Sequence, residues 1–444
     1  MLAAQKGVTV PHELLGRVSD ARRRSDELFT LIRPESLCER PIPERHRFVF
    51  YLGHLEAFDW NLLHGRALSL KAFHPEFDRL FAFGIDPVGG GLPSDQPSDW
   101  PPVEVVHDYV TQVRTSLDDK LADGALDADE LTRDGVSVTT LLNVAIEHRL
   151  MHVETLAYML HRLLPDRKVR QPDPPAPGSP PISHRMIRIP TGTATLGIHR
   201  DSAAFGWDNE YEHHTAHVLA FEIDQYKVTN QQYLDFIAAG GYDNHAFWSD
   251  SDWNWKCAHG ISHPVFWKKT NRRWLYRTMF EEVPLPLNWP VYVGYAEATA
   301  YARWAGKSLP TEEQWHRAAY GTPDGSQRLY PWGNESPSPH LGNFDFHRWD
   351  PTPVNAFPRG TSAFGVTDLL GNGWEWTSTV FAPFPGFEPF PFYRGYSADF
   401  FDGKHFVMKG GSPRTAAPLL RSTFRNWFQA HYQYVYAGFR CVNH

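Results

Sequence analysis

A proline-rich segment in the middle of the chain limits its fold more than any other feature. Residues 165–181 include the run Gln171-Pro-Asp-Pro-Pro-Ala-Pro-Gly-Ser-Pro-Pro181. Proline lacks a backbone N–H and fixes its own φ angle, so this stretch can form neither a helix nor a central strand. It predicts a semi-rigid, extended linker. We therefore expect two domains, at 1–165 and 184–444, joined by a linker at 166–183.

The residues before the linker predict four helices, because apolar side chains recur in them near the helical period. The four segments are 8–34, 50–60, about 102–121 and 138–164. Ser137 and the threonines that follow it supply hydroxyls that cap the start of the last helix. Four helices predict an up-down bundle, and bundles can hold metal ions on core side chains of facing helices.

After the linker the sequence changes to short strands, few helices and many Gly, Pro, Trp and Asn residues. Strands are predicted at 186–190, 194–197 and 221–228, and helices begin after Thr229, Gly294 and Thr311. Much of the remainder must be loops pinned by aromatic side chains. We expect an irregular α+β domain whose long ordered loops carry function.

Two histidines four residues apart are the main chemical signal of the first domain. His148 and His152 lie on one face of the predicted helix, one turn apart, where two imidazoles can chelate one divalent metal. A third ligand must come from another segment, and His54 in the second predicted helix is the best candidate. The alternative is a chance pair, since the chain has 23 histidines.

Composition excludes several classes of protein. A net charge of −8 argues against a nucleic-acid binder, which needs a basic face. The three cysteines form no CxxC pair and no disulfide framework, which suits a reducing cytosol. The first residues lack the apolar core of a signal peptide, and no stretch approaches the ~20 apolar residues that span a bilayer. We expect a cytoplasmic protein without a membrane or nucleic-acid partner.

Seven short motifs in the second domain carry a family resemblance. They are Phe205-Gly-Trp-Asp-Asn-Glu210, Val228-Thr-Asn230, Leu309-Pro-Thr-Glu-Glu-Gln-Trp315, Pro331-Trp-Gly-Asn334, Gly371-Asn-Gly-Trp-Glu-Trp376, Lys409-Gly-Gly-Ser412 and Gly438-Phe-Arg-Cys441. In this order they resemble the formylglycine-generating-enzyme-like fold, a variant of the C-type lectin fold. The resemblance covers about residues 184–444.

The first domain resembles a DinB-type four-helix bundle, through the His-x3-His-x-Glu string that ends at Glu154 and the upstream Gly53-His54. The two domains in this order resemble the nonheme-iron sulfoxide synthases of ergothioneine biosynthesis and their ovothiol and selenoneine relatives. The resemblance implies that His54, His148 and His152 hold Fe(II), and neutral imidazoles suit that ion. Nearby carboxylates are candidates to orient the second ring nitrogens, namely Glu56, Asp59, Glu147 and Glu154.

The reaction that the resemblance implies is the O2-dependent joining of sulfur or selenium to C2 of the imidazole of hercynine, the Nα-trimethylated histidine. Asn426 and Trp427 match the segment that helps to bind the trimethylammonium group, although Trp427 could also be a core residue. Tyr393, with Tyr396 as second choice, matches the tyrosine that donates a proton during bond formation. The resemblance also places the site between the two domains.

The sequence departs from the family pattern at three positions. Synthases that use γ-glutamylcysteine carry an Asp and an Arg where this chain has Phe428 and Tyr432, and a Gln where it has Met151. An aromatic pair cannot make the bidentate carboxylate contact of an arginine. We therefore expect a small thiol such as cysteine, or a selenosugar, as the donor, and favour the selenoneine-type branch.

Two other functions remain as alternatives. A formylglycine-generating oxidase needs a pair of cysteines in the C-terminal segment, but no Cys lies between Gly411 and Gly438, and Cys441 suits a buried structural position. A non-catalytic, lectin-like binding protein fused to a DinB bundle would bind no iron and consume no O2. The three histidines argue against it.

Overall fold

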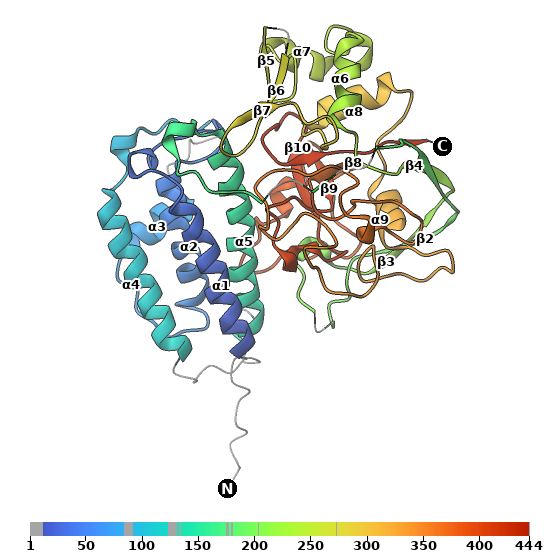
Figure 1. Ribbon diagram of the computed structural model, residues 1–444. Coiled ribbons are helices and arrows are strands. Elements are labelled where there is room, and N and C mark those ends of the chain that lie inside the picture. Colours follow the sequence, from blue (N-terminus) through green and yellow to red (C-terminus); the bar gives the residue numbers. More distant parts are fainter. Residues whose placement is uncertain are drawn as a thin grey trace. The chain divides into compact units, whose positions relative to one another are not determined.

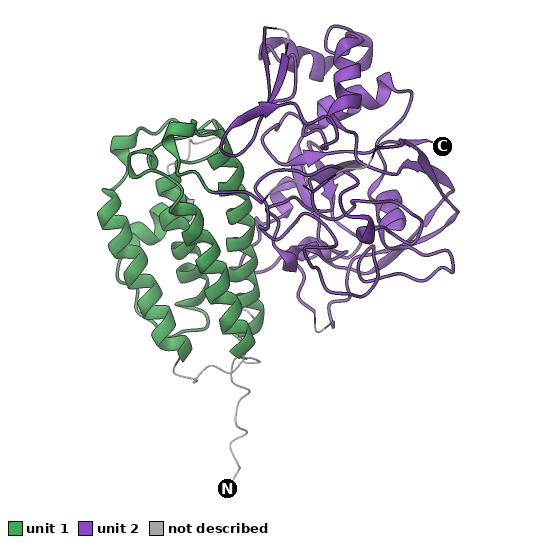
Figure 2. Ribbon diagram, viewed as in Figure 1, with its two compact units in different colours: residues 1–171 green, residues 172–444 purple. Residues whose placement is uncertain are grey.

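The computed structural model describes residues 12–83, 92–122, 131–132, 135–174, 177–178, 181–202, 204–271 and 273–443. The chain forms two compact units, residues 1–171 and 172–444 (Figure 2). No helix in the described ranges is both long and apolar enough to cross a membrane.

Unit 1 is helical. Its α-helices are α1 (His12–Phe29), α2 (Phe48–Leu63), α3 (Pro75–Phe83), α4 (Val103–Ala122) and α5 (Val138–Arg162), with 3-10 turns at Pro34–Ser36, Pro97–Asp99 and Pro165–Arg167. The four predicted helices correspond to α1, α2, α4 and α5, which Figure 1 shows side by side. The predicted cap is confirmed, because the Ser137 side chain accepts a hydrogen bond from the Thr140 N–H. The short α3 was not predicted.

Helix α2 is the centre of unit 1, since it packs against α3, α4 and α5. Fourteen of its sixteen residues are buried. A helix that is apolar on nearly all sides belongs in a core, which explains why its sequence shows little amphipathic pattern. Part of the predicted linker packs on this unit, because the Val169 N–H donates to the Leu31 carbonyl.

Unit 2 combines short strands with short helices. The strands are β1 (Met186–Ile189), β2 (Gly192–Leu196), β3 (His214–Val218), β4 (Phe221–Asp224), β5 (Trp267–Thr270), β6 (Arg273–Arg277), β7 (Glu282–Pro284), β8 (Trp374–Val380), β9 (His405–Lys409), β10 (Asn426–Gln429), β11 (Ala437–Gly438) and β12 (Val442–Asn443). The helices are α6 (Asn230–Ala238), α7 (Asp250–Ala258), α8 (Tyr295–Trp304) and α9 (Glu312–Tyr320). The mixed α+β class is as predicted.

The strands form four small sheets, with strand orders β1-β4-β12, β10-β9-β8-β11, β2-β3 and β5-β6-β7. In the second sheet β10, β9 and β8 are antiparallel neighbours, and β11 pairs parallel to β8. The core around Trp315 and Leu369 lies where α9 packs on β2, β3, β8 and β9. The predicted caps Thr229 and Thr311 are confirmed, and each belongs to a capping box with a glutamine at the third helical position.

Candidate functional site

Three histidines converge in unit 1. His54 comes from α2, and His148 and His152 come from α5. The Nε2 atom of His152 lies 3.2 Å from Nε2 of His54 and 3.1 Å from Nε2 of His148. All three ligand atoms lie within 4.8 Å of one another, and no other such group of histidines, cysteines or carboxylates occurs in the described residues. The structure therefore brings the three predicted ligands together.

His54 is fixed in one tautomer by its neighbour α3. Its Nδ1 lies 2.7 Å from the carbonyl oxygen of Phe81. Because a carbonyl only accepts, Nδ1 carries the proton and Nε2 presents a lone pair. Gly53 permits this contact, since a Cβ there would lie 2.4 Å from the Phe81 ring. The Gly-His pair thus allows α3 to approach α2 closely enough to orient the imidazole.

The three imidazoles are neutral near pH 7. Burial lowers the pKa of His54 to about 4, against a smaller opposing effect of the Phe81 carbonyl. Burial, followed by the neighbouring histidines, lowers the pKa of His148 well below its ordinary value. The pKa of His152 is lowered in the same way. The Phe58 ring stacks on His148 at 3.4 Å and so fixes its orientation.

This donor set fits a first-row divalent metal. Two nitrogens at about 2.1 Å from one ion lie about 3.0 Å apart at a right angle and about 3.4 Å apart in a tetrahedron. The observed separations of 3.1 and 3.2 Å fall in this range. Neutral imidazole suits zinc, copper, iron and nickel. The arrangement therefore favours a metal site over a chance histidine pair.

The prediction that Glu56 and Asp59 orient the histidines is wrong. Both carboxylates accept hydrogen bonds from Arg149, at 2.9 and 2.7 Å. The other predicted candidates, Glu147 and Glu154, are buried within α5. The group that orients His54 is a backbone carbonyl, which sequence reasoning missed because α3 itself was missed.

In unit 2 the predicted tyrosines lie in one aromatic cluster with Trp427. The Tyr396 ring stacks on Trp207 at 3.9 Å and meets Trp427 edge-on at 5.4 Å. Tyr393 lies 5.6 Å from Tyr396. Burial, and secondly the charge of Asp208, raises the pKa of Tyr393 to about 12, so its phenol keeps its proton at neutral pH.

The residues of β10 divide between two faces. Side chains alternate along a strand, so Trp427 points to one face, and Asn426 and Phe428 point to the other. On its face Trp427 stacks on Phe381 at 4.2 Å with nearly parallel rings. On the opposite face Phe428 stacks on Tyr432 at 5.0 Å. The structure therefore separates Asn426 from Trp427 and brings Phe428 and Tyr432 together.

Two further positions that the sequence singled out are Met151 and Cys441. Met151 lies half-buried in α5 between His148 and His152, and its carbonyl accepts from the Thr155 hydroxyl. Cys441 is fully buried, as expected for a structural position, and burial raises the pKa of its thiol.

Comparisons with known proteins agree with this arrangement. Residues 17–156 match the DinB superfamily, and residues 175–444 match the sulfatase-modifying factor enzyme 1-like domain. Over 447 residues the chain is 33% identical to a hercynine oxygenase of Mycolicibacterium thermoresistibile, which covers 98% of this chain and 96% of that protein. The chain belongs to the hercynine oxygenase family.

Two further relatives match the chain at lower identity or over a smaller share of its length. Ergothioneine biosynthesis protein 1 of Neurospora crassa is 29% identical over 92% of this chain and 55% of that protein. The formylglycine-generating enzyme of Mycobacterium tuberculosis is 31% identical, but over only 46% of this chain. The hercynine oxygenase family therefore matches the chain across both units, which confirms the predicted resemblance and the predicted fold class.

Sequence reasoning missed a histidine–aspartate pair between α7 and the segment that follows β10. His431 Nε2 lies 2.8 Å from an Asp252 carboxylate oxygen, and its ring stacks on Trp255 at 4.4 Å. Asp252 and Trp255 belong to α7, far from His431 in the chain, so no local sequence pattern predicts the contact. In this member of the hercynine oxygenase family the pair thus joins the segment after β10 to α7.

Proposed function

We propose that this protein is a nonheme Fe(II) enzyme that joins sulfur or selenium to C2 of the imidazole of hercynine, with O2 as the oxidant. In this reaction a C–H bond at C2 is replaced by a C–S or C–Se bond, and O2 accepts the electrons. The observation that carries the proposal is the cluster of three neutral histidines in a chain of the hercynine oxygenase family.

His54, His148 and His152 would hold the iron through Nε2. Bound Fe(II) would supply the one-electron chemistry by which O2 becomes reactive. The protein keeps the imidazoles neutral by burial and orients His54 through the Phe81 carbonyl. Three protein ligands leave other coordination positions for substrates.

The aromatic cluster of unit 2 is suited to a cationic acceptor. A trimethylammonium group is attracted to the face of a tryptophan by roughly 0.5–2 kcal/mol. We assign this role to Trp427 alone, since the side chain of Asn426 points to the opposite face of β10. Tyr393 holds a proton at its phenol oxygen and serves as the proton donor, and Tyr396, stacked on Trp207, is the second choice.

The Phe428–Tyr432 stack supports a donor without a carboxylate to bind. Neither ring can pair with the charged amino-acid groups of γ-glutamylcysteine. An aromatic face with the polar tip of Tyr432 suits a sugar. We therefore propose a selenosugar or a small thiol as donor. Cysteine is the second candidate, because relatives are named for ergothioneine biosynthesis.

Mass spectrometry of parallel reactions, each with one donor, tests the proposal. Protein loaded anaerobically with Fe(II) receives hercynine and, in parallel, cysteine, γ-glutamylcysteine or a selenosugar before O2 is admitted. An adduct with the selenosugar supports a selenoneine-type synthase, and an adduct with cysteine supports an ergothioneine-type synthase. If iron-loaded protein forms no adduct with any donor, the hercynine reaction is wrong. Protein that binds no iron would favour a non-catalytic binding function.

A further inference from the structure

A buried arginine connects the two helices that carry the histidines. Arg149 of α5 is 1% exposed. Its guanidinium donates to Glu56, Asp59 and the Leu55 carbonyl of α2, at 2.9, 2.7 and 2.9 Å. A fourth contact reaches the Ser25 hydroxyl of α1 at 3.3 Å. One side chain thus joins α5 to α2 and α1.

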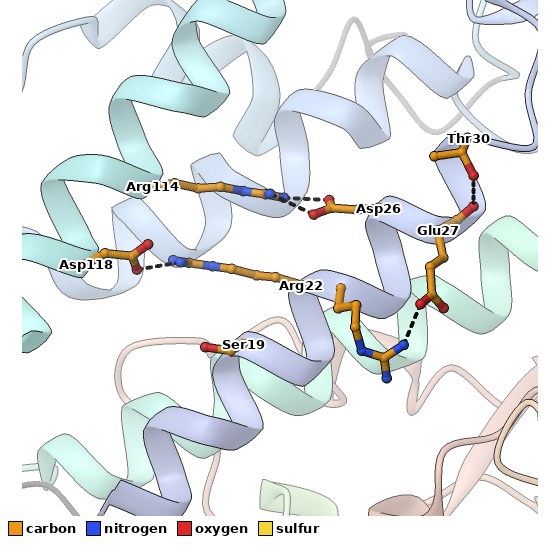
Figure 3. A pocket seen from close by; sticks show the side chains of 8 residues that line it. Ser19, Arg22, Asp26, Glu27, Thr30, Arg114 and Asp118 are labelled. Atoms are coloured by element: carbon orange, nitrogen blue, oxygen red, sulfur yellow. Dashed lines mark hydrogen bonds and ion pairs between the residues drawn. The ribbon is translucent and has the colours of Figure 1, made fainter.

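The ion pairs continue from Arg149 to the surface. Glu56 also accepts from Arg114 of α4, at 2.9 and 2.7 Å, and Arg114 makes a two-bond contact with Asp26 of α1 at 2.8 Å. Arg114 and Asp26 line an open groove of about 420 Å³ between α1 and α4 (Figure 3). The chain Arg149–Glu56–Arg114–Asp26 therefore runs from the core to this groove.

The groove itself does not indicate a charged ligand. Its lining contains three arginines and three carboxylates, so their charges balance. Figure 3 shows Arg22 paired with Asp118, and Arg114 paired with Asp26. The part of the network that bears on the histidine cluster is its buried end, at Arg149.

A buried ion pair is weak evidence for stability, because desolvation offsets the attraction between the charges. It does, however, fix geometry, since a guanidinium donates in a rigid planar fork. Arg149 follows His148 directly, and its acceptor Leu55 follows His54 directly. The arginine therefore links α2 and α5 at the residues next to two of the three histidines.

We propose that Arg149 is a positioning residue that fixes α5 against α2 and so sets the spacing of the three Nε2 atoms. The inference rests on the proposed metal site and goes beyond it. Arg149 has no lone pair to offer a cation, so it acts through His148 and His54 alone.

Metal affinity of the full-length protein tests this role. Titration with Fe(II) under anaerobic conditions gives the dissociation constant, and Co(II) absorption spectra report the ligand geometry. Arg149→Met alone would leave the buried Asp59 carboxylate without its arginine and Glu56 with Arg114 only. Glu56→Gln and Asp59→Asn are therefore combined with it to remove the buried charges together. Loss of partners around ligand residues typically weakens metal binding by about 10- to 100-fold. We expect a loss of this size and an altered Co(II) spectrum in the triple variant.

Two further variants complete the design. Arg149→Lys keeps the charge but lacks the fork, and we expect weaker binding here too. Arg23→Met removes exposed ion pairs to Asp20 and Glu27 within α1, and this control should bind metal as the wild type does. Wild-type affinity and spectrum in the lysine or the triple variant would overturn the positioning role. A wild-type protein that binds neither ion would instead overturn the proposed metal site.

Discussion

The two units bring their candidate functional side chains together in different ways. In unit 1, three identical groups from two helices converge within 4.8 Å, and helical periodicity alone places two of them together. In unit 2, the aromatic cluster combines Trp207, the 393–396 segment and β10, which lie far apart in sequence. Helix geometry thus determines the first site, whereas loop packing determines the second. We therefore expect loss of a clustered histidine in unit 1 to have a larger effect than loss of an aromatic ring in unit 2.

Loss of a histidine should have the largest effect. His148→Ala leaves two ligands, and we expect iron affinity to fall by more than the roughly 100-fold that follows loss of an outer partner. Anaerobic Fe(II) titration measures this. His64→Ala is the matched control, since His64 ends α2 and stacks on Trp60 outside the cluster. Stoichiometric, tight iron in the His148 variant would refute the ligand assignment.

Removal of the Tyr393 hydroxyl in unit 2 should have the second-largest effect. Tyr393→Phe should leave iron and hercynine binding unchanged while bond formation slows by about 100- to 10,000-fold, because the proton donor is lost. With a pKa of about 12, the phenol is protonated below that pH, so its ionisation adds no pH dependence near neutrality. Single-turnover product yield is the measurement. Wild-type yield would move the role to Tyr396, and Tyr330→Phe serves as control.

A single methyl group should disturb unit 1 more modestly. Gly53→Ala places a Cβ 2.4 Å from the Phe81 ring, and such overpacking costs about 1–3 kcal/mol in the free energy of unfolding. Gly16→Ala on α1 meets nothing within 4 Å and should stabilise the helix by about 0.5–1 kcal/mol. Chemical denaturation separates the two. Equal stabilities would show that α3 moves aside without cost.

The smallest effect is expected at Trp427. Trp427→Leu removes the aromatic face that would attract the trimethylammonium group, worth roughly 0.5–2 kcal/mol. We expect the dissociation constant of hercynine to rise by about 2- to 30-fold, as measured by calorimetry. Histidine, which carries a strongly hydrated primary ammonium in place of the trimethylammonium group, should show a smaller change in affinity between the two proteins. If hercynine affinity does not change, Trp427 is a core residue only.

Prediction from sequence succeeded where local periodicity decides the structure. The four-residue spacing of His148 and His152, the Ser137 cap and the capping boxes of α6 and α9 depend on neighbours within one helical turn. The third predicted ligand, His54, also lies in an apolar helix, α2. These features need no knowledge of the tertiary fold.

The errors all involve contacts between distant segments. Helix α3 has only nine residues, too few for a clear period, so the Phe81 carbonyl that orients His54 was missed. Glu56 and Asp59 were assigned to the histidines because they are near in sequence, but Arg149 competes for both. The His431–Asp252 contact spans 179 positions and has no local signature.

The alternation along β10 limits how this protein can change over evolutionary time. Trp427 and Phe428 are adjacent in sequence but serve opposite faces. An insertion or deletion in the strand would exchange every side chain between the faces and damage both sets of contacts together. Point substitutions at 428 and 432 leave the Trp427 face intact. If Phe428 and Tyr432 bind the donor as proposed, single substitutions can change the donor, whereas an insertion or deletion in β10 would also damage the Trp427 face.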